Sequence, residues 1–321
     1  MDRQPISEQL DVELHCPYWP ETFAQDYLRL GYWGNHTFAS MLATQASQRP
    51  THTALVDGEL RLSYAELDRR VGLLADGLKN KGLVPGDVVI VQLPNQAAFV
   101  ELSFALFRAG VIPVFALPAH REHELLQFCR RTEAKAYFHV PRHAGFDYAE
   151  LADSLQRQVP SLTHLVALEE NAPGDALQWL YGTAAYAAAP VVSAVACFQL
   201  SGGTTGTPKL IPRRHHEYLY NARASAERCR MDEHSRYLAV LPMAHNFPMS
   251  SPGFLGTLCS GGTLVIARQP SPVECFEIIR RESITHTALV PTLALLWMEL
   301  EHFLKTRIRH TGVALPGHFG P

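Results

Sequence analysis

The sequence predicts an α/β protein with two successive lobes, each built on a doubly wound, Rossmann-like parallel sheet. From residue 88 onward, short apolar runs alternate with segments of helical length, and this alternation is typical of parallel strands covered by helices. A loop rich in glycine follows the uncharged apolar run Ala194 to Leu200, so the loop lies at the carboxyl end of a predicted strand. Ligands of open α/β sheets bind at that end. The loop is therefore the expected ligand site.

Length, charge and composition agree with this class and argue against several others. A chain of 321 residues with 47% hydrophobic residues is long enough for two or three lobes with substantial cores. The net charge is only -3 and no long Lys/Arg cluster occurs, so no nucleic-acid partner is expected. The first 16 residues contain no apolar core and form no signal peptide. The six cysteines contain no Cys-x-x-Cys pair, and we interpret them as reduced core residues.

One uncharged stretch, Gly182 to Leu200, has nearly the length of a membrane span. It is rich in alanine, weakly hydrophobic and interrupted by Pro190, which favours a linker followed by a buried strand. We therefore expect a cytoplasmic protein without a membrane partner.

The N-terminal part is expected to form an arm and then the first lobe. Residues 1–35 are rich in aromatic residues and proline without a clean period, so they predict an arm packed on the body. The first lobe spans residues 36–190. It opens with a helix from Thr37 to Gln48, followed by a hairpin with Asp57-Gly58 between its strands.

A second helix of the first lobe precedes the regular alternation. Ser63, with Glu66 three residues later, is a capping box that opens a helix to about Asn80, and this interpretation of Ser63 is favoured over a catalytic one. Strands and helices alternate after Pro85-Gly86. The predicted strands are Val88–Leu93, Ile112–Ala116, Ala136–His139 and Leu165–Leu168, and the predicted helices are Ala97–Ala109 and Glu122–Thr132.

The second lobe is expected over residues 191–303, beginning with the strand before the glycine-rich loop. The predicted helices are His216–Arg230, one after Gly253 that ends near Leu258, Pro272–Glu282 and Thr292–Phe303, and the predicted strands are Tyr237–Leu241, Thr263–Ala267 and Thr287–Val290. Residues 213–216, Arg-Arg-His-His, are interpreted as a solvated helix start rather than as ligands. The tail, residues 304–321, breaks the rhythm and offers at most one weak strand.

The loop Leu200 to Lys209, LSGGTTGTPK, has the composition of a phosphate-binding segment. Consecutive glycines leave backbone N–H groups uncovered, the Ser and Thr hydroxyls add donors, and Lys209 supplies a positive charge. It is not a Walker A motif, because Thr207 and Pro208 separate Gly206 from the lysine, so an ordinary P-loop NTPase is not expected. Taken alone, such a loop is a simple turn about as often as a phosphate site.

The loop and the segment Pro242 to Gly253, PMAHNFPMSSPG, together resemble the adenylate-forming (AMP-binding) superfamily. Within it, the sequence is similar to the aryl-acid AMP ligases of siderophore biosynthesis, which activate 2,3-dihydroxybenzoate or salicylate. The loop matches the family's phosphate-loop motif position for position, and the HNF and SSPG arrangement is characteristic of the aryl-acid branch. RLSYAELD at Arg61 to Asp68 also looks like the family's N-terminal domain. The resemblance runs from about residue 15 to about residue 303.

The resemblance implies two half-reactions that use ATP and Mg²⁺. An aryl carboxylate attacks the α-phosphate of ATP and gives aryl-AMP and pyrophosphate. The phosphopantetheine thiol of an aryl carrier protein then captures the aryl group, a step of nonribosomal peptide synthesis. The chemistry is reasonable, because a carboxylate is a poor electrophile and the mixed anhydride provides AMP as a good leaving group.

The resemblance also assigns roles to residues of both motifs. His245 would lie beside the reacting carboxylate as a catalytic and substrate-binding residue, Asn246 would hydrogen-bond the 2-hydroxyl of the ring, and Phe247 would form a wall of the pocket. In this family a serine at the position of Ser251 accompanies dihydroxybenzoate and a cysteine accompanies salicylate, so dihydroxybenzoate is favoured. The residues expected to hold the β and γ phosphates are Ser201, Gly202, Gly203, Thr204, Thr205, Gly206, Thr207 and Lys209.

Each of these features has a structural explanation when it is taken alone. A single histidine such as His245 is more often a hydrogen-bonded structural residue, and Ser250-Ser251-Pro252 alone is a helix cap. The order and spacing of the residues together favour the functional interpretation.

The sequence departs from the family after about Phe303. Family members continue with a Tyr-Gly-x-(Thr/Ala)-Glu segment that helps to place magnesium, a ribose-binding aspartate, a hinge and a small C-terminal domain with a catalytic lysine. None of these follows here, so the second lobe is expected to be incomplete and the chain to be truncated before that domain. Losing one preorganised electrostatic group costs about 10² to 10³ in rate, so we expect weak binding and no unaided turnover. The alternatives are a noncatalytic remnant that acts as an aryl-acid-binding or interaction module, and a ligase for another carboxylate.

Overall fold

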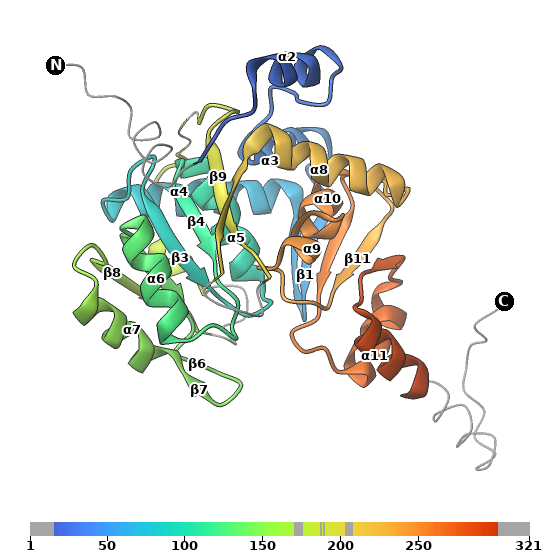
Figure 1. Ribbon diagram of the computed structural model, residues 1–321. Coiled ribbons are helices and arrows are strands. Elements are labelled where there is room, and N and C mark those ends of the chain that lie inside the picture. Colours follow the sequence, from blue (N-terminus) through green and yellow to red (C-terminus); the bar gives the residue numbers. More distant parts are fainter. Residues whose placement is uncertain (1–15, 170–175, 187, 189, 203–207, 301–321) are drawn as a thin grey trace.

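The computed structural model describes residues 16–169, 176–186, 188, 190–202 and 208–300. These residues form two sheets that lie beside each other, with helices around and between them (Figure 1). Strands and helices alternate along the chain in both, so the predicted α/β class is confirmed.

The first sheet has six strands in the order β10-β9-β4-β3-β5-β8. All neighbours pair in parallel except β10, which pairs antiparallel with β9. Every residue of β3, β4 and β5 is buried, as expected for central parallel strands covered on both faces. The strands are β3 (Val88–Gln92), β4 (Ile112–Phe115), β5 (Ala136–His139), β8 (His164–Ala167), β9 (Val195–Leu200) and β10 (Leu210–Arg214). A separate small hairpin pairs β6 (Arg142–His143) with β7 (Phe146–Asp147).

The second sheet has five strands in the order β13-β11-β12-β1-β2. Its neighbours are parallel except for the hairpin of β1 and β2. The strands are β1 (Thr53–Asp57), β2 (Leu60–Ser63), β11 (Arg236–Ala239), β12 (Thr263–Ile266) and β13 (His286–Thr287).

The two sheets exchange strands across residue 190, where the sequence places the boundary between the lobes. The early strand β1 pairs with the late strand β12, with Leu55 opposite Leu264. Conversely, the later strand β9 pairs with β4, with Val114 opposite Phe198. The expected division into residues 36–190 and 191–303 therefore does not coincide with the sheets. Local hydrophobic patterns find strands but do not say which distant strand will be the neighbour.

Helices cover the sheets, and most begin and end within a few residues of the prediction. The Ser63 hydroxyl accepts a hydrogen bond from the Glu66 N–H, as predicted for the start of α4. α2, α7 and the short α9 were not predicted. The helices are α2 (Glu21–Arg29), α3 (Phe38–Gln48), α4 (Tyr64–Asn80), α5 (Ala97–Ala109), α6 (Glu122–Thr132), α7 (Tyr148–Gln158), α8 (His215–Arg228), α9 (Asn246–Ser250), α10 (Gly253–Cys259), α11 (Pro272–Glu282) and the 3-10 turn η1 (Gln178–Leu180), and residues 291–300 are also helical.

Helix α5 forms the centre of the hydrophobic core. All of its residues are buried, because it is apolar on nearly every side and packs on α3, α4, β1 and β4. Its two charged residues have partners: Arg108 pairs with Asp68, and Glu101 accepts a hydrogen bond from the Tyr181 hydroxyl at 2.8 Å. The amino end of the helix is held from the second sheet, since the Ala97 N–H donates to Asp57 of β1 at 2.9 Å.

The start of α8 is buried, which corrects the expectation of a solvated helix start. Arg214, His215 and His216 are 4%, 2% and 3% exposed. Arg214 donates to the carbonyl oxygen of Ser193 at 2.7 Å, and the His216 ring stacks on Trp33 with 4.1 Å between the ring centroids. Burial lowers the pKa of His216 to about 4. The covering residues come from the distant N-terminal arm, so the local sequence pattern could not show this burial.

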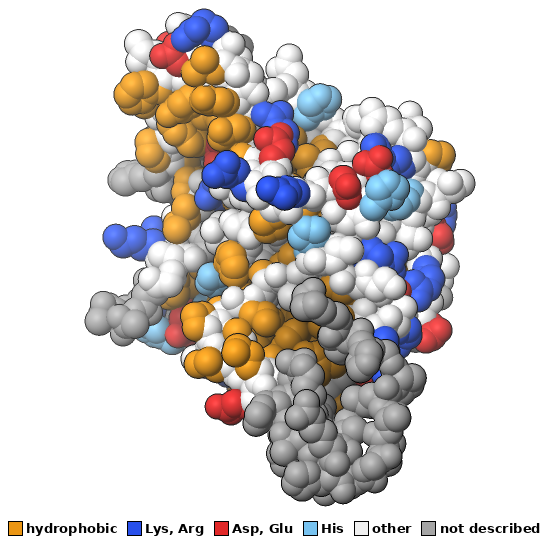
Figure 2. Space-filling view, turned by 90° about the vertical axis from the view of Figure 1, so that its right-hand side faces the viewer, with side chains coloured by type: hydrophobic (Ala, Val, Ile, Leu, Met, Phe, Trp, Pro, Cys, Tyr) orange, Lys and Arg blue, Asp and Glu red, His pale blue; other side chains and the backbone are white. Residues whose placement is uncertain are grey.

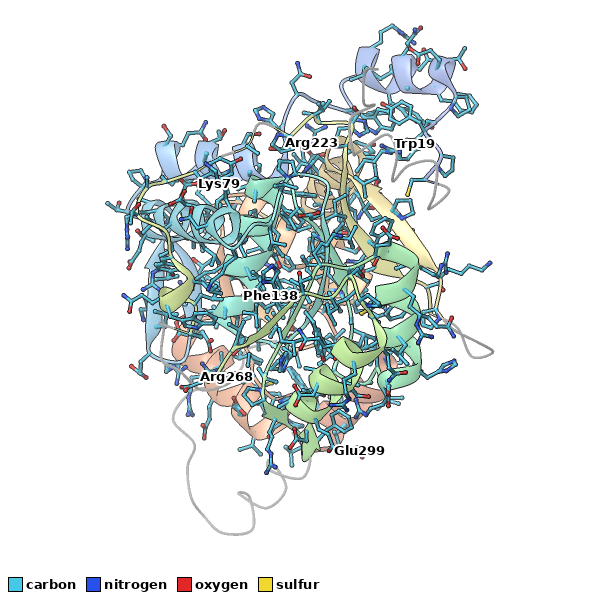
Figure 3. The ribbon with its side chains drawn as sticks, turned by 90° about the vertical axis from the view of Figure 1, so that its left-hand side faces the viewer. Trp19, Lys79, Phe138, Arg223, Arg268 and Glu299 are labelled. Atoms are coloured by element: carbon cyan, nitrogen blue, oxygen red, sulfur yellow. The ribbon has the colours of Figure 1, made fainter. Side chains whose placement is uncertain are left out.

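The arm itself packs on α8 and ends in an apolar surface. Arg223 of α8 donates to the carbonyl oxygen of Gly31 at 3.0 Å, and Figure 3 shows Arg223 and Trp19 at this end of the molecule. On the other side of the arm, Phe23 and Leu28 of α2 are 54% and 49% exposed. Figure 2 shows the apolar side chains gathered there. The predicted packing of the arm on the body is thus found, with a helix that was not expected.

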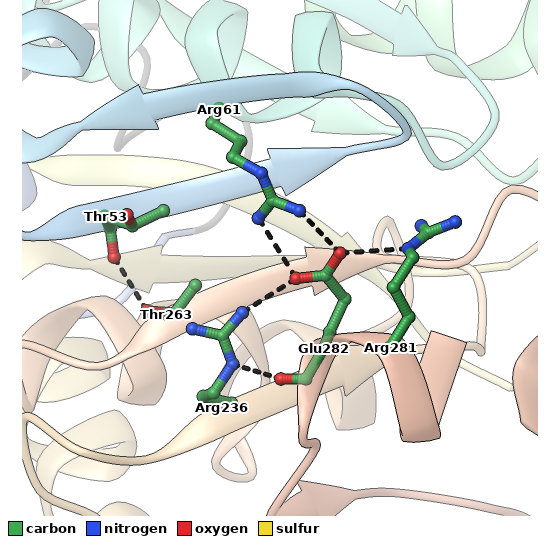
Figure 4. A network of polar contacts seen from close by, with 6 residues as sticks. All are labelled: Thr53, Arg61, Arg236, Thr263, Arg281 and Glu282. Carbon is green, nitrogen blue, oxygen red and sulfur yellow. Dashed lines mark hydrogen bonds and ion pairs between the residues drawn. The ribbon is translucent and has the colours of Figure 1, made fainter. Parts of the chain in front are cut away.

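Three arginines converge on one carboxylate at the end of α11 (Figure 4). The Glu282 side chain is 2% exposed and accepts hydrogen bonds from Arg61 of β2 at 2.7 and 3.0 Å. It also accepts from Arg236 at 2.9 Å and from Arg281 at 3.1 Å. These bonds, those from Arg61 first, lower the pKa of Glu282 to about 2. The cluster ties β2, β11 and α11 together.

The cysteines are free thiols, as expected. Cys16, Cys129, Cys197 and Cys275 are buried, whereas Cys229 is exposed and is no core residue. Within the described part of the chain, we find no helix with the length and apolar character needed to cross a membrane.

Candidate active site

The glycine-rich loop is the turn of the β9–β10 hairpin. Leu200 pairs with Leu210, and beyond this pair the Ser201 N–H donates to the Lys209 carbonyl at 3.0 Å. The Lys209 N–H in turn donates to Ser201 Oγ at 2.9 Å. These two bonds close the base of the loop, where Gly202 and the Lys209 side chain are exposed. The remaining predicted phosphate ligands lie outside the described residues: Gly203, Thr204, Thr205, Gly206 and Thr207.

The segment expected to hold the aryl acid follows β11 and contains the short helix α9. His245 is the N-cap of this helix, and its Nδ1 accepts a hydrogen bond from the Phe247 N–H at 3.4 Å. The bond uses Nδ1, so a ligand would meet Nε2. Both side chains are accessible, with His245 exposed and Phe247 38% exposed. Met243 and Ala244, just before the cap, are buried and anchor the segment.

A direct contact joins the strand that leads into the loop to the second motif. Gln199 of β9 donates from Nε2 to the sulfur of Met249 in α9 at 2.9 Å, and both side chains are buried. Ser201, the first predicted phosphate ligand, lies two residues after Gln199, and Asn246 lies one helical turn before Met249. The carboxyl end of β9 in the first sheet therefore contacts the short helix that follows β11 of the second sheet, a proximity that the sequence indicated only through the family resemblance.

Buried Asn95 holds the chain that leads from β11 to α9. Its Nδ2 donates to the Leu241 carbonyl at 3.0 Å, and its Oδ1 accepts from the Met243 N–H at 2.9 Å. One side chain thus satisfies the two backbone groups on either side of Pro242. Asn95 was not predicted as a site residue, although a polar residue just after a buried parallel strand is a signal that could have indicated it.

Helix α8 holds α9 from the other side. The Tyr218 hydroxyl donates to Asn246 Oδ1 at 2.9 Å, and Tyr218 is fully buried. One turn further along, Asn221 Nδ2 donates to the Ser250 carbonyl at 3.0 Å and to the Ser250 hydroxyl at 2.8 Å. Burial raises the pKa of the Tyr218 hydroxyl, so the group remains protonated. No local pattern in the sequence distinguishes these two residues from ordinary core positions.

Ser251 follows α9 and lines an open hollow beside α8. The other residues that line it are Tyr220, Asn221, Ala224, Ser225, Arg228, Cys229 and Pro252. Behind it, Gly253 has a φ of +55°, and a Cβ at this position would lie 2.2 Å from the Pro248 carbonyl oxygen. Glycine is required here, because any side chain would displace the backbone of α9.

Among the described residues, His245, Asn246, Phe247 and Ser251 lie on one short segment that contacts the strand leading into the loop, but the first three do not line the hollow beside Ser251. Within the part of the chain that the structure describes, no group of three or more His, Cys, Asp or Glu side chains could hold a metal ion. The arrangement offers hydrogen-bonding groups and an exposed aromatic ring to an organic ligand, with one exposed lysine at the loop.

Residues 42–315 match the family model described as AMP-binding enzyme, so this chain belongs to that family. The match extends to residue 315, beyond residue 303, where the resemblance was expected to end. The family predicted from the two motifs is confirmed.

Curated relatives indicate which members of this family the chain resembles. The chain is 52% identical to pyochelin synthase PchD of Pseudomonas aeruginosa over 287 aligned residues. The alignment covers 89% of this chain and 52% of that protein. The chain is 44% identical over 281 residues to 2,3-dihydroxybenzoate-AMP ligase of Bacillus subtilis, covering 88% of this chain and 52% of that protein. The chain therefore spans about half the length of the curated relatives it matches.

A solved structure agrees with the fold. The apo structure of MbtA from Mycobacterium smegmatis superimposes with a TM-score of 0.83 at 40% identity, over 91% of this chain and 55% of that one. The α/β architecture is thus that of the adenylate-forming enzymes.

Proposed function

We propose that this chain contributes an aryl-acid adenylation site, which binds 2,3-dihydroxybenzoate or salicylate together with ATP and forms aryl-AMP and pyrophosphate. The observation that carries the proposal is the contact between Gln199 and Met249. It joins a strand that ends in a family phosphate motif to a helix that begins with His245 and Asn246. One of the relatives bears the name of a 2,3-dihydroxybenzoate-AMP ligase, which agrees with this substrate class.

The proposed roles of the residues are those that the family resemblance implies, and the chemistry of each side chain suits its role. Ser201, Gly202, Lys209 and the residues between them would hold the phosphates through hydroxyl, backbone N–H and ammonium donors. His245 would contact the carboxylate, Asn246 the 2-hydroxyl and Phe247 the ring face. Ser251 would form a hydrogen bond with the 3-hydroxyl, as donor or acceptor. Because salicylate lacks this hydroxyl, the bond would favour dihydroxybenzoate.

The proposal includes two further participants. Mg²⁺ would accompany the phosphates of ATP and neutralise part of their charge, and the described residues contain no metal cluster of their own. A carrier protein with a phosphopantetheine thiol would accept the aryl group from the mixed anhydride, because a thiolate attacks an acyl phosphate readily and AMP departs.

The test separates catalysis from binding. Exchange of labelled pyrophosphate into ATP that depends on 2,3-dihydroxybenzoate or salicylate would support adenylation. Calorimetric binding of these acids without exchange would reduce the function to an aryl-acid-binding module, and exchange with unhydroxylated benzoate alone would reassign the substrate. Failure to bind any aryl acid or ATP would refute the proposal.

A further inference from the structure

Two successive contacts lead from Arg213 of the phosphate hairpin to Asn246, and an ion pair with Glu217 holds Arg213 in place. Arg213 of β10 forms two hydrogen bonds with Glu217 of α8, at 2.9 and 2.7 Å. The same guanidinium lies over the Tyr218 ring, 4.1 Å from its centroid. The Tyr218 hydroxyl then donates to Asn246 Oδ1 at 2.9 Å.

Tyr218 is held in place independently of any ligand. It is fully buried, and its ring lies between the Arg213 guanidinium and the core, where Phe38 contacts it edge to face at 6.1 Å between centroids. Such an ion pair stacked on an aromatic ring stabilises one ring position, because guanidinium groups are attracted to ring faces. The hydroxyl oxygen therefore has a fixed position beside Asn246.

We propose that Tyr218 is a positioning residue that sets the orientation of the Asn246 side-chain amide. The donated bond occupies Oδ1 and turns Nδ2 toward the ligand side, so Asn246 presents a donor. A donor is complementary to an oxygen beside the carboxylate of the acid, such as the ortho-hydroxyl oxygen, and offers nothing to an unsubstituted ring. This inference deepens the proposed function and rests on it. Tyr218 would thereby determine the preference for ortho-hydroxylated acids without touching them.

A purely structural role for Tyr218 predicts a different result. If the hydroxyl only stabilised the fold, its removal would weaken all aryl acids equally or none. If it orients the amide, its removal lets Asn246 rotate and affects only ligands with an ortho oxygen. The comparison of salicylate with benzoate, which differ by that single hydroxyl, distinguishes the two roles.

The experiment measures the dissociation constants of salicylate and benzoate for the whole chain and for Tyr218→Phe, by salicylate fluorescence and by competition. We expect the salicylate preference of the variant to fall about three- to tenfold, the effect of one hydrogen bond. Asn246→Ala should reduce the preference for salicylate over benzoate by a similar factor. The double variant should reduce it no further than either single variant, since the two residues act together.

Tyr64→Phe is the matched control. Tyr64 is also fully buried and donates to a backbone carbonyl, that of Gly262 directly before β12, at 2.7 Å. The Tyr64→Phe variant should lose about as much thermal stability as Tyr218→Phe and yet keep the full preference for salicylate. A Tyr218→Phe variant that keeps the preference within the range of Tyr64→Phe, or that weakens both acids equally, would overturn the inference. A wild-type chain without any preference for salicylate would instead refute the proposed pocket itself.

Discussion

Replacing Glu282 by glutamine tests the arginine cluster that joins the second sheet to α11. The side chain is 2% exposed, and its hydrogen bonds with Arg61, Arg236 and Arg281 lower its pKa from 4.5 to about 2. At about 1.4 kcal/mol for each pKa unit, this shift corresponds to about 3 kcal/mol. The arginine side chains are 28% to 52% exposed, so solvent screening reduces the contribution, and we expect Glu282→Gln to lower the free energy of unfolding by about 2 kcal/mol at pH 7.

The pH dependence has a defined sign. The pKa of Glu282 is lower in the folded than in the unfolded chain, so its contribution is complete above the unfolded value of about 4.5. It is lost as the pH falls from there toward about 2, because the folded chain must then bind a proton on a carboxylate that three arginines hold. The stability difference between wild type and Glu282→Gln should therefore be constant from about pH 6 to 8, where the carboxylate is ionised in both states, and should shrink below about pH 4.5.

Urea unfolding followed by circular dichroism at several pH values measures this difference. Glu277→Gln is the matched control, because Glu277 lies on the same helix and is exposed. It should change the free energy of unfolding by no more than about 0.5 kcal/mol. A Glu282→Gln variant as stable as this control, or a difference that stays constant down to about pH 3, would refute the argument.

Three further substitutions test the site. Gly253→Ala forces a Cβ against the Pro248 carbonyl at a positive φ, so it should lower unfolding free energy by about 1 to 3 kcal/mol and weaken salicylate binding, whereas Gly34→Ala, with open space around it, should do neither. Asn95→Ala leaves two backbone groups beside Pro242 without their partner; urea unfolding should show a loss of about 1 to 3 kcal/mol, and a loss below about 0.5 would contradict the proposed clasp. Ser251→Cys should shift the ratio of salicylate to dihydroxybenzoate affinity about tenfold toward salicylate in calorimetric titrations, and an unchanged ratio would remove Ser251 from the specificity pocket.

Elements with strong local signals were predicted with their observed bounds. Helix α5 has no polar face, and α11 begins with a proline in its first turn, so both patterns were unambiguous. By contrast, β10 contains Pro212 and two arginines and does not look like a strand. It is tolerated because, among the described strands, β10 lies at the edge of its sheet, where a missing N–H donor costs little.

In the candidate site too, residues of a local motif could be predicted from the sequence, whereas residues that act through distant partners could not. His245, Asn246 and Ser251 could be predicted as site residues because they belong to a contiguous motif. Tyr218 and Asn95 were missed, because each acts through one hydrogen bond to a residue far away in the sequence. A tyrosine in a helix and an asparagine after a strand become meaningful only when their partners are known.

The exchange of strands between the sheets explains why the site depends on such contacts. The phosphate hairpin extends from the first sheet, whereas α9 follows β11 of the second, so no single sheet fixes their relative position. Asp57 of the second sheet accepts a hydrogen bond from the N–H of Ala97, the first residue of α5. Asn95, two residues before Ala97, hydrogen-bonds the backbone that leads to α9. A carboxylate at a helix amino end is favourable on electrostatic grounds as well. The short segment from Asn95 to Ala97 therefore links the packing of α5 to the position of the backbone before α9, where the residues proposed to bind the aryl acid lie.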